Sequence, residues 1–154
     1  MIPEITPVPT ETDRPYLPVG SICENYRRSR NKAYPLYEAA RSVAPDRVRG
    51  IGQKLELDNL LATDYDEICA DLFQILRHHT PPFCYLGSQA AAYLLIGVWL
   101  DFDAIQRHGM RLVEHFDSNT PLLGEYVVTL NDDGVVMICT RDDQGEIQIE
   151  WQSK

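Results

Sequence analysis

Two cysteines and two histidines stand near a pair of prolines in the middle of the chain: Cys69, His78, His79 and Cys84. Cysteine and histidine are ligand types that zinc prefers, and a turn at Pro81-Pro82 would fold Cys84 back towards the histidines. Their spacing matches no compact zinc motif, and Cys69 falls on the apolar face of a predicted helix. We therefore predict neither a metal site nor another cofactor.

The same segment admits a thiol enzyme built on the 80–88 loop, which we keep as a second alternative function. Cys84 would be the nucleophile, and His78 or His79 its base. A catalytic thiol needs an electropositive, partly exposed setting. Cys84 instead lies between two aromatic residues, and no orienting Asn or Asp is specified. A buried structural cysteine is the preferred interpretation, and we predict no catalytic residues.

Acidic residues recur in pairs through the second half of the chain: Asp101, Asp103, Asp132, Asp133, Asp142 and Asp143. Two-metal nucleases and glycosidases need carboxylates that converge on one cleft. These pairs instead fall at a predicted helix start and in two predicted hairpin turns, where acids are common. We interpret them as an acidic surface for a partner rather than as a catalytic site.

Basic residues concentrate in an earlier segment: Arg27, Arg28, Arg30, Lys32, Arg47 and Arg49. Tyr26, Tyr34 and Tyr37 lie among them, and arginine with interleaved aromatics can grip phosphates and stack on bases. Nucleic-acid binding through residues 26–54 is therefore the first alternative function. The segment could also clamp onto the acidic half of its own chain or contact another copy, which leaves a homo-oligomer open.

Net charge sets limits on the partner. The formal charge of −9 over 154 residues makes nonspecific binding to nucleic acid or to an anionic membrane unfavourable for the whole molecule. Residues 14–54 carry a net +6, whereas residues 55–154 carry a net −12. No secretory signal is visible at the N-terminus, so we predict a cytoplasmic protein with four reduced cysteines.

Proline content and apolar spacing outline the helical elements. Residues 1–20 hold five of the ten prolines and are predicted to form an extended arm, followed by a single domain over residues 21–154. The spacing of apolar residues predicts four to five helices. Six stretches are candidates, of which four or five are expected to form helices: Ser21 to about 31, which is the least defined, those beginning at Pro35 and at Pro45, and those over 64–79, 89–99 and 101–116.

The least polar stretch, residues 80–100, is predicted to supply the centre of the core. Residues 90–100 are uncharged but too few to span a bilayer, which needs about 20, so we predict a buried central helix and no membrane partner. After Pro121 the apolar period changes to two, which predicts three strands, 126–130, 135–140 and 147–151. The predicted fold is α+β, with this antiparallel meander packed on the helices.

Charge and the absence of a convincing catalytic cluster together favour a binding function. A strongly acidic surface attracts a basic partner over long range. We therefore predict a non-enzymatic protein-binding module of regulatory type, such as an inhibitor, immunity protein, antitoxin or adaptor.

Overall fold

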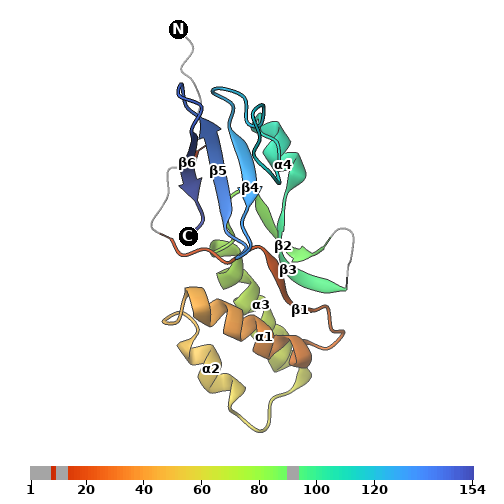
Figure 1. Cartoon of the computed structure of the whole chain (residues 1–154). Coiled ribbons are helices and arrows are strands. Elements are labelled where there is room, and N and C mark those ends of the chain that lie inside the picture. The colour runs from red at the N-terminus through yellow and green to blue at the C-terminus, as the bar shows by residue number, and fades with distance from the viewer. Residues whose placement is uncertain (1–7, 10–13, 90–93) are drawn as a thin grey trace.

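The computed structural model describes residues 8–9, 14–89 and 94–154 and shows two sheets joined end to end (Figure 1). The elements are β1 (Gly20–Glu24), α1 (Ser29–Val43), α2 (Arg49–Leu55), α3 (Ala62–His78), β2 (Cys84–Ser88), β3 (Leu95–Leu100), α4 (Phe102–Arg107), β4 (Val127–Leu130), β5 (Val136–Arg141) and β6 (Ile147–Gln152). The described residues thus form four helices and two three-stranded antiparallel sheets. A mixed helix and sheet fold is confirmed, whereas a single C-terminal sheet is not.

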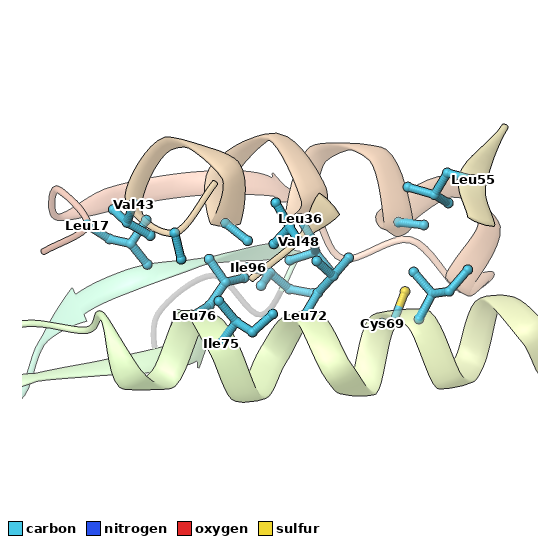
Figure 2. Close-up of a cluster of buried hydrophobic side chains, with 14 of the residues drawn as sticks. Leu17, Leu36, Val43, Val48, Leu55, Cys69, Leu72, Ile75, Leu76 and Ile96 are labelled. Atoms are coloured by element: carbon cyan, nitrogen blue, oxygen red, sulfur yellow. The ribbon is translucent and has the colours of Figure 1, made fainter. Parts of the chain in front are cut away.

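The first sheet, in the order β1-β3-β2, packs with α1 and α3 around one core. Leu36 from α1, Leu72 and Leu76 from α3, and Ile96 from β3 are buried there (Figure 2). Val98 of β3 is buried in the same core. Helix α3 confirms the predicted helix over 64–79, because its apolar face keeps the 3.6-residue period along its full length.

The predicted central helix over 89–99 is wrong. Residues 95–100 form β3, the middle strand of the first sheet, while residues 90–93 lie outside the described residues. A run that is apolar on every side has no period to separate a helix from a buried strand. Pairing on both edges, with β1 and with β2, decides for the strand.

The short helix predicted from Ser21 is also wrong, because residues 20–24 form β1. Ser21 and Glu24 have the spacing of a helix cap, but Gly20 pairs with Val98 and Glu24 with Leu95 of β3. These partners lie more than seventy positions away in the chain, so a local pattern could not reveal them. Tertiary pairing here overrides a capping sequence.

The helix predicted over 101–116 is much shorter than expected. Of Asp101 and Asp103, the two acids at the predicted helix start, it is Asp101 that caps α4, with its carboxylate accepting from the Ala104 N–H at 3.1 Å, but the helix ends at Arg107. Gly109 has φ 75, a left-handed conformation that stops helices and favours glycine. The chain then runs irregularly to β4, and Leu112 forms a parallel bridge with Val128.

The second sheet, in the order β4-β5-β6, has its three strands where the meander was predicted. Its turns are closed by side chains: the carboxamide oxygen of Asn131 accepts from two backbone N–H groups, and Asp142 does the same in the next turn. The buried residues of one face pack with Ile105 of α4 and with Met110. The meander therefore rests on α4 and the segments between the sheets, instead of on α1 and α3.

The described part of the N-terminal arm runs between the two cores. The Leu17 N–H donates to the His79 carbonyl at 2.8 Å, and the Val19 N–H donates to the Gly134 carbonyl at 2.8 Å. Leu17 is buried in the helical core, whereas Tyr16 contacts the core of the second sheet. The arm thus joins α3 to the β4–β5 turn. Among the described residues, no helix has the length and apolarity needed to cross a bilayer.

Candidate functional site

The best-defined candidate site is the segment 114–125, which we call the end loop. It leads from the segment around Leu112, which bridges to Val128 at the edge of β4, back to the start of β4. It lies against the end of β5, where Leu123 forms a parallel bridge with Arg141. The loop contains no helix or strand of its own. Its shape must therefore come from side chains that bind its backbone.

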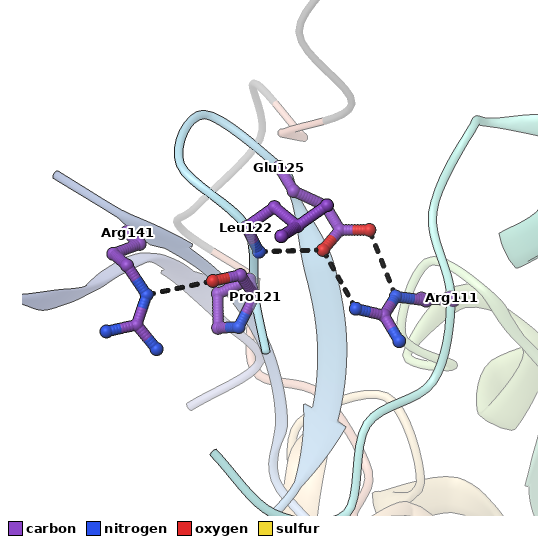
Figure 3. A network of polar contacts seen from close by, with 5 residues as sticks. All are labelled: Arg111, Pro121, Leu122, Glu125 and Arg141. Atoms are coloured by element: carbon purple, nitrogen blue, oxygen red, sulfur yellow. Dashed lines mark hydrogen bonds and ion pairs between the residues drawn. The ribbon is translucent and has the colours of Figure 1, made fainter. Parts of the chain in front are cut away.

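Arg141 provides the first of these anchors from the last position of β5. Its guanidinium donates hydrogen bonds to the carbonyl oxygens of Pro121 at 2.8 Å (Figure 3), of Thr120 at 3.3 Å and of Asp117. A further nitrogen donates to the Gly145 carbonyl at 2.8 Å. One side chain therefore ties the end loop to the β5–β6 turn.

The second anchor is an ion pair between Arg111 and Glu125 (Figure 3). Two guanidinium nitrogens of Arg111 donate to the two carboxylate oxygens of Glu125, each at 3.0 Å, and the Leu122 N–H donates to the same carboxylate at 3.0 Å. These hydrogen bonds, that of Arg111 foremost, hold the pKa of Glu125 below its usual value. The pair is therefore ionised at neutral pH and keeps both ends of the loop together.

The anchored loop presents apolar side chains to solvent. Phe116 is 42% exposed, Leu122 is 58% exposed and Leu123 is 65% exposed. Scattered exposed leucines are ordinary, but three large apolar side chains on one fixed loop are typical of a binding surface. Sequence reasoning missed them. The available indication was Pro121-Leu122-Leu123-Gly124, an apolar pair between two residues that favour turns.

Acidic side chains lie on the same loop and on the turn beside it. Glu114, Asp117, Asp143 and Glu146 are all exposed on the end loop or on the adjoining β5–β6 turn. The backbone N–H of Asn119, more than any other group, lowers the pKa of Asp117, so this carboxylate is also charged at neutral pH. Exposed apolar side chains with charged ones nearby are a common composition for a protein–protein interface.

The acids predicted to form one surface are divided among three places. Asp101 and Asp103 line a shallow hollow of about 490 Å³ beside α4. Asp132 and Asp133 lie in the β4–β5 turn, and Asp142 and Asp143 lie in the β5–β6 turn. The six residues of β5 separate the two turns by roughly 20 Å. Only the β5–β6 pair adjoins the end loop.

Asp142 is occupied by its own turn. Its carboxylate accepts from the N–H groups of Gln144 and Glu146 and from the side-chain amide of Gln148, each at 2.9 Å. The Glu146 N–H is the leading cause of the lowered pKa of Asp142. Asp142 therefore shapes the turn, while Asp143 next to it stays exposed.

The basic residues are exposed, except for half-buried Lys32, and they form two groups: Arg27, Arg28, Arg30 and Lys32 at the start of α1, and Arg47 and Arg49 beyond its end. The 15 residues of α1 separate the groups by roughly 22 Å. Arg49 pairs with Asp46 at 3.0 Å. In the described part of the chain, no ion pair joins these two groups to the second sheet, so the intramolecular clamp is not seen there.

The cysteines and histidines near the double proline have structural environments. Burial, and then the nearby Asp101, raise the pKa of the Cys84 thiol to about 12, which leaves it protonated at neutral pH. His79 is buried, with Nδ1 2.7 Å from the Pro15 carbonyl oxygen. All four cysteines are free thiols. No group of three or more potential metal ligands gathers within residues 8–9, 14–89 and 94–154.

Comparison with known proteins gives no relative from which a function could be transferred: no family model, curated protein or solved structure matches the chain. Function must therefore be inferred from the geometry and charge of the molecule itself.

Proposed function

We propose that the chain is a non-enzymatic protein-binding module that holds a basic partner on the end loop. The observation that supports this most is the exposure of Phe116, Leu122 and Leu123 on a loop that Arg141 and Arg111 fix in place. Because the loop is already ordered, a partner would lose little affinity to ordering it. Full burial of one such apolar side chain contributes about 1.5–3 kcal/mol.

Charge supports a basic partner. Residues 101–154, which include α4, the end loop and the second sheet, carry eleven acids and four bases, a net −7. Residues 14–100 carry a net +1, so the negative charge of the described chain is concentrated at this end. Net negative charge at this end accelerates encounter with a basic surface and selects against acidic ones.

The test compares a variant of the end loop with a matched variant elsewhere. In Leu122→Ser/Leu123→Ser the apolar contacts are lost, whereas Leu94→Ser removes an equally exposed leucine (64% exposed) from beside the first sheet. We expect the wild type and Leu94→Ser to retain the same partner from a host lysate, identified by mass spectrometry, and the double variant to lose it. Retention of that partner by the double variant would contradict the proposal.

Salt dependence then tests the charge of the partner. With the purified partner, the affinity of the wild type should fall at least tenfold between about 50 and about 500 mM salt, since exposed charges are screened over a shorter distance. An affinity that does not change with salt would remove the argument for a basic partner while leaving the apolar contacts in place.

The alternative of nucleic-acid binding through residues 26–54 stays a prediction. The exposure of Arg27, Arg28 and Arg30 supports it. The distance to Arg47 and Arg49, and the pairing of Arg49 with Asp46, weigh against one continuous phosphate-binding surface.

A further inference from the structure

A hollow of about 600 Å³ lies between α1, the end of α2 and the beginning of α3. Figure 1 shows α2 beside α1 at the end of the molecule opposite the second sheet. Three tyrosines line the hollow, Tyr34 and Tyr37 from α1 and Tyr65 from α3. Its volume falls within the range of about 300–1,000 Å³ that ligand pockets occupy.

Two of these tyrosines are held in place by their surroundings. The Tyr34 hydroxyl donates to the Leu55 carbonyl at 3.0 Å, which fixes a side chain that is otherwise half exposed. Tyr37 lies so close to α2 that a Cβ at Gly52 would be 2.5 Å from its hydroxyl oxygen. Glycine at position 52 therefore makes room for the Tyr37 ring, and the aromatic wall is built into the helix packing.

The charge around the hollow favours a cation. Glu38 and Arg41 form an ion pair at 3.6 Å on its rim, which leaves Glu56 and Asp58 facing a single further base, Arg30. Residues 55–67, which include the α2–α3 connection, contain five acids and no Lys or Arg. The three acids and two bases that line the hollow leave a net charge of −1 there, although the hollow lies in the more basic part of the chain.

We propose that this hollow binds a cationic side chain, arginine or lysine, from a partner polypeptide. The faces of aromatic rings attract cations within about 6 Å, and carboxylates beside them strengthen the attraction. The hollow is larger than one side chain, so residues that flank the cation in a polypeptide fit as well. The proposal is independent of the end loop, which lies in a different part of the fold.

The probe is an acetylated and amidated peptide with one arginine between glycines, titrated into the full chain and followed by NMR and calorimetry. The control peptide carries citrulline, which has the shape of arginine without its charge. We expect the arginine peptide to bind at least fivefold more tightly and to shift the ring signals of Tyr34, Tyr37 and Tyr65. Equal binding of the two peptides would overturn the proposal.

Variants locate the site. Tyr34→Leu removes an aromatic face and should weaken binding by about two- to fivefold, the size of one exposed cation–π contact. Tyr34→Phe keeps the face but loses the hydrogen bond to Leu55, so it should weaken binding less than Tyr34→Leu does. Tyr26→Leu, an exposed tyrosine outside the hollow, serves as the matched control. Equal affinities for Tyr34→Leu and Tyr26→Leu would contradict the site.

Charge variants and competing ligands complete the test. Glu56→Gln/Asp58→Asn should weaken arginine-peptide binding about threefold or more, because two attractive charges are removed, whereas Asp143→Asn at the far end should not. If tetramethylammonium ions bind as tightly as the peptide, the hollow recognises a free cation, and the proposal of a polypeptide partner is overturned. A single-stranded oligonucleotide that shifts the same tyrosines, when the peptide does not, would overturn the proposal in favour of a nucleic acid.

Discussion

At the scale of single residues, hydrogen bonds from arginine side chains hold the end loop in shape. The guanidinium of Arg141 accounts for hydrogen bonds to four carbonyl oxygens, those of Asp117, Thr120, Pro121 and Gly145. A planar group with five donors suits this task better than an ammonium, whose three donors converge on one point. Much of the loop's order thus depends on one side chain.

Replacing Arg141 tests this dependence. Arg141→Ala removes these four hydrogen bonds, and we expect the free energy of unfolding to fall by about 2–3 kcal/mol. Arg107→Ala is the matched control, since the exposed Arg107 makes one long hydrogen bond, 3.3 Å to the Asp103 carbonyl within its own helix, and should change stability by less than about 0.5 kcal/mol. Urea unfolding followed by circular dichroism measures both. An equal loss of unfolding free energy in the two variants would contradict a stabilising role of the Arg141 hydrogen bonds.

At the scale of elements, the middle strand of the first sheet depends on the absence of a side chain. A Cβ at Gly97 would stand 2.2 Å from the Gly20 carbonyl oxygen, 2.8 Å from the Ser21 Cα and 2.9 Å from the Trp99 ring. Two of these three atoms belong to the backbone of β1, which cannot turn aside as the end of a flexible side chain could. The close approach of β1 to β3 therefore requires glycine at this position.

Gly97→Ala should accordingly lower the free energy of unfolding by about 3 kcal/mol, because the new methyl group forces β1 away from β3. Gly50→Ala provides a contrast: nothing lies within 4 Å of its Cβ position, and it is a helical residue of α2. There alanine should raise stability by about 0.5–1 kcal/mol. Thermal and urea unfolding compare the two. A neutral Gly97→Ala would show that β1 can shift without loss.

The sequence predicts those elements whose pattern is local. The apolar stripe of α3 and the alternation in β4, β5 and β6 repeat within a few residues, so their types could be assigned. Strand β3 could not, because its run is apolar throughout and shows no period, and β1 depends on a partner far along the chain. The end loop lay beyond sequence reasoning for a similar reason. Arg141 binds the Pro121 carbonyl from twenty residues away, and no residue pattern encodes side-chain contacts to backbone at that distance.

The predicted site residues also divide into those with a local role, which the sequence predicts, and those whose position depends on distant contacts. Asp101 as a helix cap and the acids of the hairpin turns were assigned from local roles, and the structure uses Asp101 and Asp142 in these ways. Whether such acids meet on one surface depends on strand order. The antiparallel order β4-β5-β6 places consecutive turns at opposite ends of the sheet, so the acidic pairs are separated.

At the scale of the whole molecule, the two cores share residues, and we therefore expect them to unfold as one cooperative unit. Val19 and Cys84 pack against both the helical core and the core of the second sheet. Leu17 is 2% exposed within the first core and lies next to Tyr16, whose ring stands edge-on to Trp151 in the second at 5.9 Å. Loss of either core would expose these shared residues and destabilise the other.

The two tryptophans allow this coupling to be measured, because each reports on a different sheet. Trp99 in β3 donates from Nε1 to the Gly87 carbonyl at 2.9 Å, and Trp151 is buried in the second sheet. In Trp151→Phe the fluorescence follows the first sheet, and in Trp99→Phe it follows the second. For each variant, we expect fluorescence and circular dichroism to give the same urea midpoint, as a two-state transition requires.

Adding Leu17→Ala should lower the free energy of unfolding by about 2–5 kcal/mol in both tryptophan variants. Two separate midpoints within one variant, or a shift confined to Trp99, would show that the sheets unfold independently.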